Sequence, residues 1–528
     1  MVRIVTGSIP NRLIERAAAL PDRPAIVEAG EGDRREITFG ELARRVARLA
    51  AGMREVGIGP GSRVLIFVPM SIDLYLAMMG ALHTGAAVVL VDAWTDRHRL
   101  DAVVRVARPN LFIAMPAAHA FRLISPALRS IAHHWIVTGR FLALERFERE
   151  DAAPPADVDA SVPALITFTT GSTGTPKAVP RSHDLLWAQH LALANHLRLA
   201  PDDVDMPTLP VFVLNNLASG ITTVLPDFDP ARPAEVDPQR IVAQIKEEGV
   251  TTTSGSPAFY QHLADWCREN RRTLDVRLWA GGSPVYPRLA RALGQLTREG
   301  ANVVYGSTEA EPIAGISADA MVRAMSREGP EAGLCCGVTV PEISVRIVRV
   351  ADGPIQLGDG GWQEWELERG ATGEIVVTGD HVVGAYLDSP EETALHKIQD
   401  GDRTWHRTGD AGRLAEDGTL WLLGRVATRV VRSGFTWWSA PAELKALDFP
   451  GVRHASYFGI PDPILGHRAV LCIEAPPGTF GTAPEFVLVG RLEPIPVDVV
   501  HILRHIPRDP RHASKTDMPA LLRLIGRG

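Results

Sequence analysis

Apolar residues recur along most of the chain at the spacings of alternating helices and strands. The first amphipathic helix is marked by apolar residues at intervals of three and four: Leu42, Val46, Leu49, Met53 and Val56. Thr38 stands three residues before Glu41, as in a capping box that begins a helix. The apolar run Arg63–Val68 follows Gly57 and Gly61 and predicts a buried strand. A helix followed by a buried strand predicts an α/β fold with a parallel sheet.

One long apolar segment raises the question of a membrane span. Leu74–Val91 carries no charged residue over 18 positions, which is at the lower limit for a spanning helix. Gly80, Gly85 and the small residues beside them divide this segment into a helical half and the strand Val88–Val91. A buried helix that leads into a buried strand is typical of a parallel α/β core, so we expect no transmembrane segment.

The same alternation continues through the middle of the chain. Further elements are predicted as helices at Leu185–Leu197, Ile241–Glu248, Ala258–Arg268 and Arg288–Thr297, and as strands at Thr251–Ser256 and Val276–Trp279. Beyond them, a strand at Gly373–Gly379 and a hairpin at 410–425 predict a β-subdomain. Because 528 residues exceed one ordinary core, we expect a large N-terminal domain of parallel-rich sheets at 1–424. A small, mobile C-terminal α/β domain is expected at 425–528.

Composition and charge narrow the class of protein. The net charge of -7 and the pI near 6.2 give no general attraction to nucleic acid. A content of 45% hydrophobic and 22% charged residues is typical of a globular protein. The four cysteines lack the paired spacing of a zinc site and indicate no disulfide framework: Cys267, Cys335, Cys336 and Cys472. The N-terminus lacks the apolar core of a signal peptide, so we expect a cytoplasmic protein.

Hydroxyl groups and glycines dominate the segment that follows the predicted strand Ala164–Phe168. The segment ends with a lysine and comprises Thr169, Thr170, Gly171, Ser172, Thr173, Gly174, Thr175, Pro176 and Lys177. Backbone N–H groups, hydroxyls and a lysine cation bind phosphate oxygens in anion-binding loops. The segment is no Walker A loop, because Pro176 stands five residues after Gly171. By composition, a polyphosphate loop and a flexible linker both remain open.

This segment resembles the signature loop of the adenylate-forming superfamily, which comprises acyl-CoA ligases, peptide-synthetase adenylation domains and luciferases. Further motifs follow in the family's order: Ala280–Pro284, Val303–Glu309, Gly373–Tyr386 and His406–Asp410. The resemblance implies that the following residues bind ATP or AMP: Gly281, Gly282 and Ser283 beside adenine, Tyr305 stacked on it, Gly306, Thr308 at phosphate and Asp410 at the ribose. It also implies that Glu309 binds Mg²⁺, which takes oxygen ligands and bridges phosphates with one or two protein carboxylates.

The C-terminal part follows the family but departs from it at the hinge. Gly424-Arg425 is kept, and Arg425 is expected to reach ribose or phosphate, whereas the family's Asp and Lys are here Ala427 and Val431. Rotation at this hinge takes coenzyme A ligases from adenylation to thioester formation, so Ala427 weighs against the thioester step. Lys515 matches the family's catalytic lysine, which neutralises charge that develops between carboxylate and α-phosphate. The residues expected in catalysis are Lys515, Glu309, Thr308 and Lys177.

A looser resemblance concerns the fate of the acyl-adenylate. The altered hinge, the segments Leu209–Phe212 and Leu225–Pro230, and the loop Arg511–Lys515 look most like β-lactone synthetases of long-chain olefin biosynthesis. This implies ATP and Mg²⁺ as cofactors, a fatty or 3-hydroxy fatty acid as substrate, and other enzymes of a lipid pathway as partners. A fatty acyl-CoA ligase that uses coenzyme A and a nucleotide-binding pseudoenzyme are the alternatives. The side chains expected in the substrate pocket are Phe212, Asn215 and His183.

Overall fold

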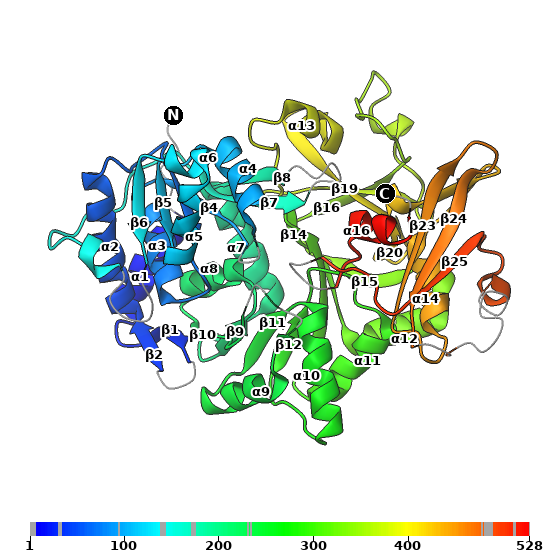
Figure 1. Ribbon diagram of the computed structural model, residues 1–528, viewed down its shortest axis with the longest axis horizontal. Coiled ribbons are helices and arrows are strands. Elements are labelled where there is room, and N and C mark those ends of the chain that lie inside the picture. Colours follow the sequence, from blue (N-terminus) through cyan, green and yellow to red (C-terminus); the bar gives the residue numbers. More distant parts are fainter. Residues whose placement is uncertain are drawn as a thin grey trace.

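The computed structural model is a mixed α/β protein with a large body and a smaller C-terminal body (Figure 1). This architecture confirms the fold class predicted from the sequence. The structure describes residues 7–29, 34–92, 95–137, 144–170, 176–229, 232, 235–476, 479, 489–509 and 514–526.

The N-terminal sheet has the strand order β6-β5-β3-β4-β7-β8. Its strands are β3 (Arg63–Phe67), β4 (Ala87–Leu90), β5 (Leu111–Ala114), β6 (His133–Ile136), β7 (Pro163–Thr170) and β8 (Pro176–Ser182). Neighbouring strands pair in parallel, except that β7 and β8 form an antiparallel pair. Helix α2 (Phe39–Glu55) begins as predicted, since the Thr38 hydroxyl accepts a hydrogen bond from the Glu41 amide at 3.2 Å.

The long apolar segment forms part of the core. Helix α3 (Ile72–His83) has every residue buried, as expected of a helix that is apolar on all sides. Ser71 caps this helix by accepting a hydrogen bond from the Leu74 amide at 3.2 Å. Gly85 then turns the chain into β4 with a φ of 81°, which glycine adopts readily. Within the described residues, no helix is long and apolar enough to cross a membrane.

A longer sheet runs through the rest of the large body, in the order β16-β17-β19-β20-β15-β14-β13-β12-β11-β9-β10-β1-β2, with β18 beside β19. Strands β9 (Val204–Pro207), β10 (Thr222–Leu225), β11 (Thr252–Gly255), β12 (Arg277–Ala280) and β13 (Ala301–Ser307) pair in parallel, as predicted. Helices alternate with them: α7 (His183–Leu197), α8 (Pro210–Ser219), α9 (Pro238–Glu247), α10 (Pro257–Glu269) and α11 (Pro287–Leu296). At the sheet's far end lie β1 (Pro24–Glu28), β2 (Arg35–Thr38) and the preceding helix α1 (Ile9–Ala19).

The other half of this sheet is antiparallel and forms the predicted β-subdomain. Its strands are β14 (Ala310–Ser317), β15 (Leu334–Thr339), β16 (Ser344–Val348), β17 (Gly373–Thr378), β18 (Lys397–Asp400), β19 (Arg403–Leu414) and β20 (Thr419–Arg425). Two helices accompany them, α12 (Ala318–Glu328) and α13 (Pro390–His396). The predicted hairpin is the pair β19 and β20, in which Asp410 stands opposite Arg425.

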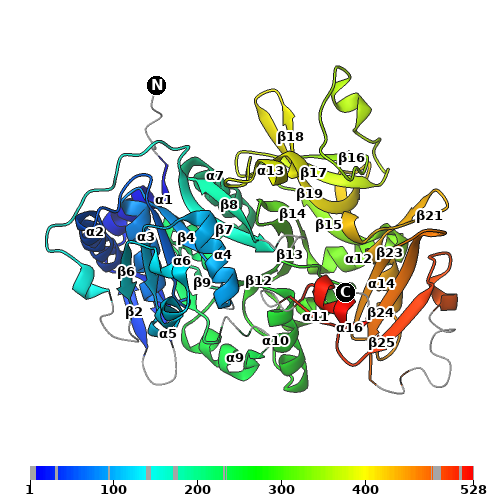
Figure 2. The same cartoon turned by 45° about the horizontal axis from the view of Figure 1, so that its top comes forward.

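The C-terminal body has its own three-stranded sheet, in the order β23-β24-β25. Its elements are the hairpin β21 (Val430–Arg432) and β22 (Phe435–Trp437), helix α14 (Ser439–Leu447), strands β23 (His454–Asp462), β24 (Gly466–Glu474) and β25 (Val499–Leu503), and helix α16 (Met518–Leu524). Figures 1 and 2 both show α16 on the side of this body that faces the middle of the molecule. The domain boundary after residue 424 stays a prediction.

Helix α14 joins the two bodies. The Tyr286 hydroxyl of the large body donates a hydrogen bond to the Glu443 carboxylate at 2.7 Å, and Lys445 pairs with Glu331 at 2.8 Å. Burial raises the pKa of the Glu443 carboxyl to about 7, although the hydrogen bonds from Tyr286 and from the Tyr457 amide lower it. A titratable contact therefore lies where the bodies meet.

Candidate adenylation site

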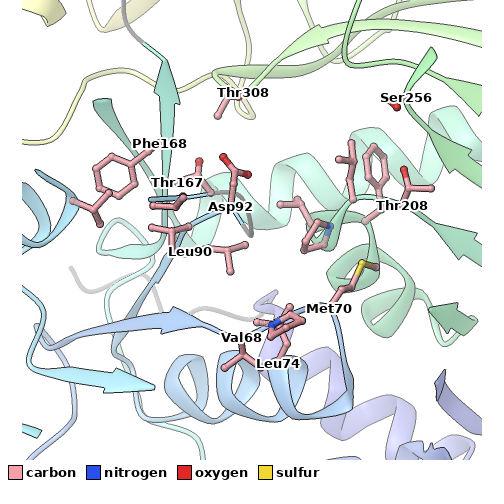
Figure 3. Close-up of a pocket in the computed structure, with 18 of the residues that line it drawn as sticks. Val68, Met70, Leu74, Leu90, Asp92, Thr167, Phe168, Thr208, Ser256 and Thr308 are labelled. Atoms are coloured by element: carbon pink, nitrogen blue, oxygen red, sulfur yellow. The ribbon is translucent and has the colours of Figure 1, made fainter. Parts of the chain in front are cut away.

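A pocket of about 140 Å³ lies where strands of the two sheets end (Figure 3). Four of its polar side chains follow the strands β4, β9, β11 and β13, and they are Asp92, Thr208, Ser256 and Thr308, while Thr167 lies within β7. Apolar side chains complete the wall, among them Val68, Leu74, Leu90, Phe212 and Phe259. Ligands of open α/β sheets bind outside the carboxyl ends of the strands, so this place agrees with the predicted site.

The predicted phosphate loop begins and ends on the antiparallel pair β7 and β8. Thr169 stands opposite Lys177 and Thr170 opposite Pro176 in this pair, while residues 171–175, including Gly171, Ser172, Thr173 and Gly174, lie outside the described residues. The pairing fixes the Lys177 backbone beside that of Thr169, near the start of β8.

Helix α13 contacts the Lys177 side chain. The ammonium lies 2.8 Å from the Glu392 carboxylate, 2.8 Å from His396 Nε2 and 5.3 Å from the centre of the Tyr386 ring. Burial, followed by the charge of Lys177, lowers the pKa of His396 to about 4, so its ring is neutral at pH 7 and can accept a hydrogen bond from the lysine ammonium. Tyr386 belongs to a motif seen in the sequence, whereas Glu392 and His396 do not, and the three together fix the direction of the Lys177 cation.

Glu309 is held by contacts from the β-subdomain. The Tyr386 hydroxyl donates a hydrogen bond to Glu309 Oε1 at 2.9 Å, and the Glu309 carbonyl accepts one from the Val383 amide at 2.9 Å. Burial opposes ionisation of this carboxyl, but attraction to His406 and Lys397 and the Tyr386 hydrogen bond outweigh it and lower the pKa to about 2. Glu309 is therefore ionised at neutral pH.

An ionised, oriented carboxylate at Glu309 fits a Mg²⁺ ion, which prefers oxygen ligands. Among the described residues, no group of three or more His, Cys, Asp and Glu side chains could hold a metal by itself. That agrees with an ion that takes its other ligands from water and from the phosphates of ATP. When bound there, Mg²⁺ would neutralise phosphate charge, and Glu309 would hold it beside Thr308.

Asp410, the predicted ribose ligand, has both carboxylate oxygens engaged. Tyr305 donates its hydroxyl proton to Oδ2 at 2.8 Å, and Arg425 donates from Nη1 to Oδ1 at 2.8 Å. The Arg425 side chain is 63% exposed and also donates to the Thr408 carbonyl at 3.3 Å. The structure thus brings together three of the residues predicted to bind the nucleotide.

The glycine-rich turn predicted beside adenine follows β12. A Cβ atom at Gly281 would come within 3.1 Å of the Val304 carbonyl, and Gly282 has a φ of 89°. The Ser283 hydroxyl is buried without a hydrogen-bond partner among the described residues. Gly306 is similarly tight, because a Cβ atom there would lie 3.1 Å from the Ala310 carbonyl. A side chain at Gly281 or Gly306 would therefore require the neighbouring carbonyl to shift by a few tenths of an ångström, and Gly282 suits its positive φ.

The three side chains expected in the substrate pocket have different positions. Phe212, in α8, lines the pocket. Asn215 is buried and its Oδ1 lies 2.8 Å from His190 Nδ1, while His183 is buried with no partner for its Nε2 among the described residues. Neither Asn215 nor His183 is among the residues that line the pocket. Two wall residues that sequence reasoning missed are Asp92 and Arg181.

Lys515 belongs to the C-terminal body. Its side chain is exposed, its amide donates to the Asp509 carboxylate at 2.8 Å, and its carbonyl accepts from the Asp509 amide at 2.8 Å. Lys515 is not among the residues that line the pocket. The structure therefore gathers the sites predicted in the large body and leaves Lys515 on the other body.

Residues 13–387 match the AMP-binding enzyme family, and the chain belongs to that family. It is an ATP-dependent enzyme of the AMP-forming, adenylate-forming ligases. It is 33% identical over 505 residues to an olefin beta-lactone synthetase of Xanthomonas campestris pv. campestris, covering 91% of this chain and 89% of that protein. A second olefin beta-lactone synthetase, from Stenotrophomonas maltophilia, is 33% identical over 496 residues and 88% of both chains.

Solved structures agree in fold. The amide bond synthetase McbA from Marinactinospora thermotolerans superposes with a TM-score of 0.79 at 22% identity, over 98% of this chain and 99% of that one. The ATP-bound MatB from Rhodopseudomonas palustris gives the same TM-score at 23% identity, over 98% of this chain and 99% of that one. The resemblance predicted from the motifs, including that to β-lactone synthetases, is thus confirmed.

Proposed function

We propose that the protein activates a 3-hydroxy fatty acid as its acyl-adenylate and then closes the β-lactone, releasing AMP and pyrophosphate. The observation that carries this proposal is the 33% identity to two olefin beta-lactone synthetases over about nine tenths of each chain. The largely apolar pocket that ends at Thr308 suits an alkyl chain with an activated carboxyl at one end. Glu309 would bind the metal and Lys177 the phosphates. Asp410 and Arg425 would bind the ribose.

The second step needs no external nucleophile. A hydroxyl on the β-carbon is held next to the activated carbonyl by the substrate itself, and such proximity can lower a barrier by about 7–11 kcal/mol at best. Lys515, delivered by the C-terminal body, would stabilise charge in the first step. The alternative, thioester formation with coenzyme A, is disfavoured by Ala427 at the hinge position where the family has Asp.

The test supplies purified protein with ATP, Mg²⁺ and a 3-hydroxy fatty acid, with and without coenzyme A. We expect the β-lactone, AMP and pyrophosphate in both mixtures. The unsubstituted fatty acid of the same length serves as the matched substrate control, and it should stop at the acyl-adenylate. A product that forms only with coenzyme A and is a thioester would replace the lactone proposal by the acyl-CoA ligase.

A further inference from the structure

The Lys515 backbone lies in a short paired segment of the C-terminal body. Residues 507–509 run antiparallel to residues 515–517, with a bridge between Arg508 and Thr516. Backbone hydrogen bonds of 2.9 Å and 2.8 Å join the two stretches at either end of this pairing. We call the two stretches the neck. Because its backbone belongs to the neck, Lys515 has a defined place on the C-terminal body although its side chain is exposed.

The three-stranded sheet of the C-terminal body holds the neck. The Glu474 carboxylate, at the end of β24, accepts hydrogen bonds from the Ile506 amide at 2.9 Å and from Arg508 at 3.1 Å. His454 Nε2, at the start of β23, lies 3.2 Å from the Thr516 hydroxyl. Glu474 is 6% exposed, so its charge is buried together with its partners. The neck is therefore fixed to two strands of the sheet as well as paired with itself.

Asp509 supplies the side chain that joins Lys515 to the neck. Its Oδ1 atom accepts one hydrogen bond from the Lys515 amide at 2.8 Å and another from the Ser514 amide at 3.2 Å. Its own amide donates to the Lys515 carbonyl at 2.8 Å. Aspartate side chains commonly hold backbone amides in this way at turns, and the negative charge strengthens each bond. One oxygen atom thus fixes the direction in which the chain enters Lys515.

The orientation of Lys515 matters because the C-terminal body must bring this lysine to the site. Lys515 is not among the described residues that line the pocket, so its backbone is oriented within its own body. Lysine carries its charge on a long stem, and the direction of the backbone limits where the ammonium can reach. Displacing a catalytic group by about 1 Å can lower a rate by about 10²-fold. A residue that fixes this backbone therefore affects the step in which Lys515 acts.

We propose that Asp509 is a positioning residue that orients Lys515 for adenylation of the substrate carboxylate; this rests on the role given to Lys515 in the proposed function. In that step a carboxylate oxygen bonds to the α-phosphorus of ATP. The bond from the α-phosphorus to the bridging oxygen breaks, and its electron pair leaves with pyrophosphate. No proton is transferred. Lys515 meets the developing charge, whereas Asp509 acts only through the Lys515 backbone.

The test measures acid-dependent pyrophosphate exchange in Asp509→Ala and Asp509→Asn. Alanine removes the oxygen that accepts both amides, so kcat should fall by about 10- to 100-fold. The KM values for ATP and for the acid should stay at the wild-type level, because the pocket belongs to the large body. Asparagine keeps an oxygen at the Oδ1 position and should retain kcat within roughly fivefold of the wild type. Equal kcat in Asp509→Ala and wild type, or equal losses in both variants, would overturn the proposal.

A double-mutant cycle with Lys515→Ala separates positioning from general damage to the fold. If Asp509 acts through Lys515, the variant carrying both Asp509→Ala and Lys515→Ala should exchange at the rate of Lys515→Ala alone. An equal further loss in that background would overturn the positioning role. Exchange at the wild-type rate in Lys515→Ala would instead remove Lys515 from the proposed function. The assay records adenylation only, so absence of lactone would leave this test intact.

Asp462→Ala is the matched control in the same body. The Oδ1 atom of Asp462 also accepts two backbone amides, from Ile464 at 3.0 Å and from Leu465 at 3.1 Å, in the turn between β23 and β24. This variant should lower the Tm without changing kcat for exchange. A loss of kcat in Asp462→Ala equal to that in Asp509→Ala would show that any loosened turn of this body slows adenylation, and the specific role of Asp509 would fail.

Discussion

Glu309 and Lys515 are proposed to act in the same adenylation step from opposite kinds of surroundings. Glu309 is half-buried in the turn between β13 and β14, two inner strands of the long sheet, and Tyr386 from another connection orients its carboxylate. Lys515 is exposed on the C-terminal body, where its own backbone amide donates a hydrogen bond to the Asp509 carboxylate. The difference separates a part of the site that the fold prepares in advance from a part that another body must bring to it.

The largest expected loss of activity follows from replacing Lys515, which the C-terminal body is proposed to bring to the site. Lys515→Ala should lower carboxylate-dependent pyrophosphate exchange by about 10²–10³-fold, because the developing negative charge loses its cation. The control is Lys246→Ala, which removes an exposed lysine from α9. Exchange at the wild-type rate in Lys515→Ala would show that Lys515 does not act in adenylation. The contrast drawn above between Glu309 and Lys515 would then not hold.

A smaller effect on activity is expected at Glu309, whose carboxylate the fold orients in advance. Tyr386→Phe deletes the hydroxyl that orients Glu309, so the Mg²⁺ concentration for half-maximal exchange should rise by about 10- to 100-fold. Tyr457→Phe is the matched control, since its hydroxyl donates to the Pro496 carbonyl inside the C-terminal body at 2.9 Å. It should alter thermal stability and not the Mg²⁺ requirement. Equal Mg²⁺ curves for Tyr386→Phe and wild type would contradict the positioning role.

The smallest effect concerns the contact between the two bodies. Burial raises the pKa of Glu443 to about 7, so the folded protein keeps this proton at pH values where an unfolded chain has released it. The stability from this group is complete below the ordinary carboxyl pKa of about 4.3 and is lost as the pH rises through about 7. The wild-type Tm should therefore fall by a few degrees between about pH 5 and pH 8.

Glu443→Gln should flatten that part of the pH dependence. Glu331→Gln is the control at the same contact, because the hydrogen bond with Lys445 lowers the pKa of Glu331 and this carboxylate stays ionised over the range. Differential scanning calorimetry of the three proteins measures the slopes. A Glu443→Gln slope equal to that of the wild type would show that Glu443 does not titrate with unfolding.

Local patterns were sufficient for most of the fold. The spacing of apolar residues at 42–56 defines α2, and the glycine-containing turn after β19 identifies the hairpin with Asp410. The motif residues of the large body could be predicted for the same reason, since each follows a strand that its own segment specifies. Alternation of helix and buried strand then places those strand ends on one side of the sheet.

The contacts between motifs could not be predicted, because pairing of distant strands creates them. Tyr386 and Glu309 are 77 residues apart, and Lys177 and His396 are 219 apart. Spacing gives no sign of such pairs, although Glu392 and His396 at i and i+4 on α13 show the pattern of two side chains on one helix face. The sequence did not identify Asp92 as a pocket residue, because the pocket forms only where the two sheets come together in the folded protein.

The pair Asp410 and Arg425 has a mechanical consequence. Arg425 is the last residue of β20, and the chain passes from it toward the C-terminal body. Just before it, a Cβ atom at Gly424 would lie 2.1 Å from the Ser439 hydroxyl, so α14 presses closely on this point. We therefore predict that any rotation of the C-terminal body at the end of β20 would also move Arg425, the partner of the proposed ribose ligand, and would couple that rotation to the release of AMP.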